Sequence, residues 1–149
     1  MRMDPNISRL ISILYRKNQV YISHSLRVYG VSAAEQPFLV YLYDKDGATQ
    51  EEMAAYLNID KAAAARSVRS LIEKGFVTKS RDEIDRRCNR IRLTQKAMGC
   101  KDEIILRLGL WNVFLMEGMD HAEKEAAFGA ISKMAAKVDG IDFRKEWNE

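Results

Sequence analysis

Residues 60–74, DKAAAARSVRSLIEK, are the stretch that decides the fold. Their apolar residues recur at helical spacing, which predicts a short amphipathic helix. Asp60 is a good N-cap because its carboxylate can accept unpaired N–H groups of the first turn, and Gly75 suits a left-handed position after the last turn. Two faces result: an inward face of Ala64, Val68, Leu71 and Ile72, and an outward face of Ala62, Arg66, Arg69 and Glu73.

The outward face is suited to the major groove of DNA. Arginine donates bidentate hydrogen bonds to guanine edges, and small apolar groups tolerate thymine methyls. An ordinary surface helix also carries arginine, so this segment alone leaves both interpretations open. The flanking segments distinguish them.

The segment before this helix predicts a helix-turn-helix. Thr49-Gln50-Glu51-Glu52 is a capping box, and it starts a short helix that turns inward at Met53, Ala54 and Leu57. Asn58-Ile59-Asp60 then makes a turn of about three residues into the next helix. Another capping box, Ser32 to Glu35, precedes a further helix through residues 38–43.

The segment after the helix predicts a β-hairpin. Residues 76–79 read as one strand, and residues 89–93 alternate arginine with Ile91 and Leu93, as in a half-buried strand. Residues 81–88 form the charged loop between them. By itself this loop could be only solvated, but beside a helix-turn-helix it indicates a wing whose arginines enter the minor groove.

Long apolar helices are predicted at both ends of the chain. One spans residues 4–30, capped by Asp4 with Pro5 at its first position; others follow Thr94, with a break at Gly118 and a new cap at Asp120. These helices carry more apolar surface than one small winged domain can cover. We therefore expect a homodimer formed through the end helices, whose two-fold axis relates two DNA-binding lobes.

Composition excludes several classes of protein. The chain has 149 residues, of which 47% are hydrophobic and 30% charged, as in a globular protein of one domain. No apolar run reaches the length of a transmembrane helix, so no membrane partner is expected. His24, His121, Cys88 and Cys100 fit no metal, disulfide or catalytic spacing, and no glycine-rich phosphate loop is present. We therefore expect a cytoplasmic protein that is not an enzyme and needs no cofactor or metal.

Charge is concentrated in the centre of the chain. Residues 60–96 contain eleven Lys or Arg and five Asp or Glu, a net charge of +6, while the whole chain carries only +3. The ends together are therefore mildly acidic. This distribution favours a local contact with a polyanion.

Three motifs, in this order, resemble the MarR (multiple antibiotic resistance regulator) family of winged helix-turn-helix transcription regulators. They are Gln50 to Ala54 with Asn58 to Lys61, then Leu71 to Val77, and then Asp85-Arg86-Arg87 with Ile91 to Lys96. The resemblance extends from about Ile7 to Val138. The sequence departs from it at the alanine run 62–65, where the family often has Ser or Thr, and at Ala97, where it has Gly. Neither cysteine lies in the first helix, so a peroxide-sensing role is not supported.

The expected fold class is mainly α with a small β-hairpin wing. A single domain, 1–149, would contain a winged helix-turn-helix DNA-binding lobe (32–96) and a helical dimerisation lobe built from the N- and C-terminal helices (4–30 and 97–140). The resemblance implies a homodimeric repressor that binds double-stranded DNA at a pseudo-palindromic operator. The alternative is a winged-helix module that binds another protein and no operator.

The residues themselves suggest roles in DNA binding. Base contacts are assigned to Arg66, Arg69 and Ser70, with Ala62 and Ala63 as close-contact positions; Thr49, Gln50 and Lys61 would hold phosphates. Arg86 and Arg87 would enter the minor groove, with Asp85 orienting one of them by a charge-assisted bond. The resemblance further implies relief by a small phenolic or lipophilic effector that binds between the lobes. Candidate lining residues are Tyr15, His24, Tyr41 and Trp111, for which a plain core or interface role is the alternative.

Overall fold

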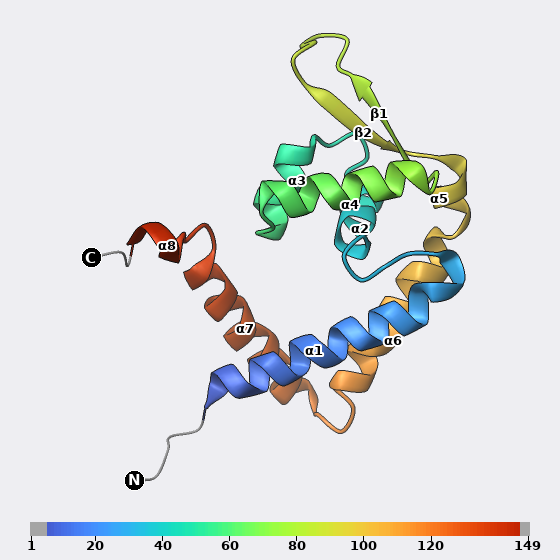
Figure 1. Ribbon diagram of the computed structural model, residues 1–149. Helices are drawn as coiled ribbons and strands as arrows, with labels where there is room; N and C mark the ends of the chain where they lie inside the picture. Colours follow the sequence, from blue (N-terminus) through green and yellow to red (C-terminus); the bar gives the residue numbers. More distant parts are fainter. Residues whose placement is uncertain (1–5, 147–149) are drawn as a thin grey trace.

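The protein is described by a computed structural model over residues 6–146 (Figure 1). It is mainly helical with a single antiparallel hairpin in this range, as the sequence predicts. The elements in chain order are α1 (Ile7–Leu26), the 3-10 helix η1 (Arg27–Tyr29), α2 (Gln36–Asp44), α3 (Gln50–Leu57), α4 (Lys61–Glu73), β1 (Val77–Arg81), β2 (Asn89–Leu93), α5 (Gln95–Gly99), α6 (Lys101–Leu115), α7 (His121–Val138) and α8 (Phe143–Glu146).

The winged lobe, α2 to α5 with the hairpin, is built around one apolar core. Helix α3 begins with the predicted capping box at Thr49, and it ends at Asn58, which adopts a left-handed conformation with φ 54°. Asp60 then caps α4 by accepting from Ala63 N at 2.8 Å. Large side chains at most 1% exposed fill the centre of this lobe: Phe38, Leu39, Leu42, Met53, Leu71, Phe76 and Ile91.

The wing is wider than the predicted hairpin. Strands β1 and β2 pair antiparallel from Val77 opposite Leu93 to Arg81 opposite Asn89. The segment before α3 adds to the other edge of β2, because Gly47 N donates to Ile91 O at 3.0 Å and Ile91 N donates to Ala48 O at 2.9 Å. The wing and the start of α3 are therefore one hydrogen-bonded unit.

The end helices α1 and α6 lie below the winged lobe, and α7 diverges from them toward one side of that lobe (Figure 1). Helices α1 and α6 lie side by side: the Tyr21 hydroxyl donates to Arg107 O at 2.7 Å, and the Tyr21 and Trp111 rings stack at 4.8 Å. Helix α7 reaches back to the helix-turn-helix, where the Asn58 side chain donates to Asp139 Oδ1 at 2.8 Å and accepts from Gly140 N at 3.2 Å.

Two boundaries of the end helices differ from the prediction. The predicted cap at Asp4-Pro5 lies outside the described residues; α1 begins at Ile7, and Asn6 caps it by accepting from Arg9 N at 3.3 Å. The single helix predicted after Thr94 is in fact two, α5 and α6, because the backbone leaves the helical conformation at Cys100 (φ −108°, ψ 4°).

The prediction that Ile72 belongs to the inward face of α4 is also wrong. Ile72 is 37% exposed, because it lies about 80° around the helix axis from Ala64 at 3.6 residues per turn. Ser67 takes the inward place, and its hydroxyl donates to Ala34 O at 3.2 Å.

Candidate nucleic-acid interface

Helix α4 presents two unpaired arginines to solvent. Arg66 and Arg69 are exposed, and neither forms a salt bridge with any residue of the range 6–146. Ala62 and Lys61 are exposed beside them, and Ala63 is half-buried. The guanidinium groups are thus available to an outside partner, and the small side chains of Ala62 and Ala63 leave room for a close approach beside them.

The core holds α4 in place from its other face. Val68 and Leu71 are at most 2% exposed, and burying such side chains supplies most of the stability of a short helix. Gly75 ends the helix with φ 80°, and Phe76 N donates back to Leu71 O at 2.9 Å. The exposed arginines therefore project from a rigid support.

Ser70 is less exposed than the two arginines. It is half-buried, and its side chain is near enough to Glu35 to help lower the pKa of that carboxyl group. Ser70 is therefore close to Glu35, and the base contact that the sequence suggests for it stays a prediction.

The N-terminus of α3 carries two of the predicted phosphate-binding residues. Thr49 is 7% exposed, and its hydroxyl accepts from Glu52 N at 3.1 Å. The same Glu52 carboxylate accepts from Thr49 N at 3.2 Å. The Thr49 side chain is thus occupied in capping, whereas Gln50, the first helical residue, is only half-buried.

The wing tip exposes the predicted arginines and orders one of them. The Arg87 side chain is 92% exposed, and its Nε lies 3.2 Å from Asp85 Oδ1, which confirms the predicted pairing of Asp85 with a wing arginine. Asp85 also accepts from Arg87 N at 3.1 Å. The backbone bond and then the guanidinium lower the pKa of Asp85, so it is charged at neutral pH. Arg86 is exposed.

Sequence reasoning missed the role of Arg90. Its Nη2 lies 2.9 Å from Asp82 Oδ2, its Nη1 lies 3.6 Å from Glu52 Oε1, and Nη1 also donates to Gly47 O at 3.3 Å. Arg90 thereby joins the base of the wing to the first turn of α3. Nothing local in the sequence signals these contacts, because two of the partners are about forty residues away.

A hollow of about 310 Å³ between α3 and the wing brings several predicted DNA-binding residues together. Thr49, Gln50 and Arg87 line it, together with Lys79 from β1. Lys79 is exposed and was not among the sequence candidates. The sequence VTKSR of β1 does not alternate apolar and polar residues, and Lys79 shares a face with buried Val77, so no strand pattern signals its exposure.

The four candidate effector residues do not share one cavity. Tyr15 and Trp111 line an apolar groove of about 530 Å³ between α1, α6 and α7. His24 borders a shallow hollow on α1 with Arg27. Tyr41 lines a third pocket, between α2 and α3.

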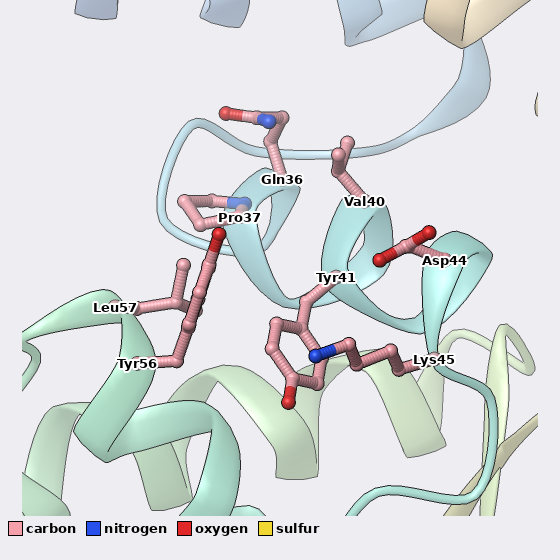
Figure 2. A pocket seen from close by; sticks show the side chains of 8 residues that line it. All are labelled: Gln36, Pro37, Val40, Tyr41, Asp44, Lys45, Tyr56 and Leu57. Carbon is pink, nitrogen blue, oxygen red and sulfur yellow. The ribbon is translucent and has the colours of Figure 1, made fainter.

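Figure 2 shows this α2–α3 pocket, of about 280 Å³. The rings of Tyr41 and Tyr56 lie 5.2 Å apart at 60°, and Lys45 Nζ lies 6.0 Å from the centre of the Tyr41 ring. Pro37 and Leu57 close the apolar side (Figure 2). Two aromatic rings, the Lys45 ammonium and the Asp44 carboxylate line the pocket, which suits a flat molecule with a polar group.

Within residues 6–146, no helix is long and apolar enough to cross a membrane. The same part of the chain contains no group of three or more His, Cys, Asp and Glu side chains placed to hold a metal ion.

Known proteins resemble this chain throughout the fold. The model of the MarR family matches residues 32–89. The HTH-type transcriptional regulator BilQ of Clostridium symbiosum is 26% identical over 132 residues, which are 89% of this chain and 92% of that protein. A MarR transcriptional regulator from Methanosarcina mazei superposes with a TM-score of 0.81 and 34% identity, over 88% of this chain and 94% of its own.

Two more distant structures share the fold and were determined with bound molecules. A MarR-family regulator from Listeria monocytogenes, complexed with 26mer DNA, has a TM-score of 0.85 and 20% identity over 92% of this chain and 91% of its own. CouR from Rhodococcus jostii, bound to p-coumaroyl-CoA, has a TM-score of 0.79 and 20% identity over 92% of this chain and 94% of its own. With the family model and the 34% identical relative, the exposed arginine helix and basic wing lead to one conclusion: the chain belongs to the MarR family and is a DNA-binding transcriptional regulator, not an enzyme.

Proposed function

We propose that two copies of this chain form a homodimer that represses transcription from a pseudo-palindromic operator and is released by a small aromatic effector. The observation that carries the proposal is the exposed basic surface of α4 and the wing, which lies beside helices with uncovered apolar faces. The basic surface supplies the contact with DNA, and the apolar faces supply the two-fold pairing.

The accessible surface supports dimerisation. The chain exposes 11492 Å², against roughly 7,800 Å² for a compact monomer of its mass. The excess includes large apolar side chains of the end helices, among them Phe114 at 63% and Phe128 at 76% exposure. Monomers rarely expose large contiguous apolar patches. A second copy of the chain is the proposed occupant of this surface, including the groove beside Tyr15 and Trp111.

The proposed residue roles follow from exposure. Arg66 and Arg69 read base edges, with Ala62 and Ala63 allowing close approach. Lys61 and Gln50 hold phosphates, and Thr49 fixes the first turn of α3 for that purpose. Helix α4 is called the reading helix below. Arg86 and Arg87 enter the minor groove beside the reading helix of each subunit.

A mobility-shift experiment tests the function as a whole. The full chain is titrated, at low ionic strength, into duplexes from the region flanking its own gene, with random duplex as competitor. We expect retention of one region at two chains per site, and weaker binding as salt rises. Equal retention of every duplex, or of none, would favour a winged-helix module that binds another protein.

Arg86→Ala tests the wing. Loss of a minor-groove guanidinium should weaken operator binding by about 1–3 kcal/mol and reduce the salt slope by about one. Fluorescence anisotropy at several salt concentrations measures both quantities. Arg16→Ala removes an exposed arginine from α1 and serves as the matched control. If affinity and slope matched the wild type, the wing would not contact DNA.

The α2–α3 pocket is the proposed effector site. A small aromatic carboxylate would stack on Tyr41 and Tyr56 and place its charge near Lys45. Such a ligand relieves repression only if it binds the DNA-free form more tightly than the DNA-bound form.

Salicylate and related phenolic acids are the probes for this site. We expect saturating ligand to weaken operator binding by about fivefold or more, and Tyr56→Ala to abolish that response while leaving DNA affinity unchanged. Tyr56 is 69% exposed, so its removal leaves the core intact. Trp111→Phe, in the other groove, is the control. A response lost in Trp111→Phe and kept in Tyr56→Ala would move the site to the end helices.

A further inference from the structure

Lys74, at the C-terminal end of α4, contacts two points of the segment that joins α1 to the winged lobe. Its Nζ lies 2.8 Å from Gly30 O and 2.6 Å from Glu35 Oε1. Gly30 closes the 3-10 turn that follows α1, and Glu35 directly precedes α2. A single side chain therefore connects the reading helix to the exit of α1.

The Glu35 carboxylate is almost completely shielded from solvent. The residue is 2% exposed, and Oε1 also accepts from Ser32 N at 2.9 Å. Oε2 is buried without a hydrogen-bond partner among the described residues. Burial raises the pKa of Glu35, but hydrogen bonds from Lys74 and Ser32 outweigh that effect and hold it below its ordinary value. The carboxylate is thus charged at neutral pH, and it depends on the Lys74 ammonium for compensation.

The backbone of Lys74 is fixed as firmly as its side chain. Lys74 N donates to Ser70 O at 3.0 Å, and Lys74 O accepts from Lys96 Nζ at 2.6 Å. The neighbouring Gly75 O accepts from the Thr94 hydroxyl at 2.6 Å. The Lys74 side chain therefore links α4 to the α1–α2 connection, and hydrogen bonds hold the backbone at its own end.

The other end of α4 is tied to the end helices as well. Asn58, two residues before the cap of α4, is hydrogen-bonded to Asp139 and Gly140 at the end of α7. The reading helix is thus linked to α1 at its exit and to α7 at its entry. Contacts at both ends of a helix restrict its rotation relative to its neighbours, whereas a contact at one end alone would allow the helix to rotate about that end.

We propose that Lys74 is a positioning residue for DNA recognition: by joining α4 to Gly30 and Glu35, it sets the angle of the reading helix to α1. This inference rests on the proposed dimer. In that dimer the angle fixes the separation of the two reading helices, and hence the spacing of operator half-sites that the protein accepts. The ammonium is engaged by Gly30 O and the Glu35 carboxylate, so Lys74 itself contributes no base contact.

Lys74→Met tests the inference with a series of operators whose half-sites are moved apart or together by one base pair at a time. We expect the wild type to prefer one spacing and the variant to lose about tenfold of that preference. Affinity for a duplex with one half-site, and its salt slope, should not change. Lys133→Met removes an exposed lysine from α7 that lines none of the pockets described above, and it is the matched control.

A second variant guards against simple misfolding. Glu35→Gln/Lys74→Met removes both charges and leaves no buried carboxylate unpaired, and thermal unfolding confirms that each variant is folded. If a folded variant keeps the wild-type spacing preference, or if neither folds, the contacts serve stability alone and the proposal fails. A fall in single half-site affinity and salt slope would show instead that Lys74 binds phosphate. Wild-type protein that bound no paired half-sites would overturn the proposed function itself.

Discussion

The substitution Ile131→Asp is expected to convert the protein into a folded monomer that binds its operator roughly 100-fold more weakly or worse. Ile131 is 56% exposed in the single chain and lines the apolar groove between α1, α6 and α7. In the proposed dimer the partner covers this groove, so the new carboxylate would be buried without a counter-charge, which costs several kcal/mol. In the monomer it remains in water and costs almost nothing.

Sedimentation velocity and operator titration, on the same samples, measure the two consequences. Ser132→Asp adds the same charge to the neighbouring exposed position, which does not line the groove, and should leave the assembly unchanged. A dimeric Ile131→Asp with full operator affinity would show that the subunits meet elsewhere. A monomer with full affinity would show that one winged lobe suffices.

Arg66→Ala is expected to weaken binding to the operator by about 1–3 kcal/mol for each half-site and to relax the choice of base at one position. Arg66 lies in the middle of the exposed face of α4 and has no salt bridge within the described chain, so its truncation leaves no buried charge behind. The loss therefore reports on DNA contact and not on folding.

Selection from a library of duplexes, by the wild type and by Arg66→Ala, measures the change in base preference. Glu73→Ala, on the same exposed face at the last turn, is the control for any general effect on the helix. If the preferred sequence stayed the same and affinity fell equally for random duplex, Arg66 would be a phosphate contact. Unchanged affinity would exclude it from the interface.

Local chemistry made most of the elements predictable. The capping boxes at Thr49 and Asp120 and the cap at Asp60 each place a helix start to within a residue, because the partners are three positions apart in the chain. The alternation of residues 89–93 gave β2 with its observed bounds. The paired charges of Asp85 and Arg87 were likewise close neighbours.

The contacts that support the candidate site were not predictable in the same way. Arg90 with Glu52, and Lys74 with Glu35, join residues that are brought together only by the tertiary fold. Ile72 lies outside the core face, although its position was predicted to be inward, because that face is centred on Ser67 and Leu71. The effector candidates were chosen by residue type, and type alone does not show that Tyr41 and Trp111 line separate pockets.

The pairing of residues 47–49 with the free edge of β2 has a thermodynamic consequence. Residues 47–49 both complete the sheet and lead into α3, so the parts proposed to grip phosphates and the minor groove are already locked in their mutual arrangement before any duplex arrives. Little chain entropy remains to be lost on association, and the heat capacity change should reflect buried surface alone, without a folding contribution. Calorimetry over a range of temperatures would reveal this as a small, constant slope.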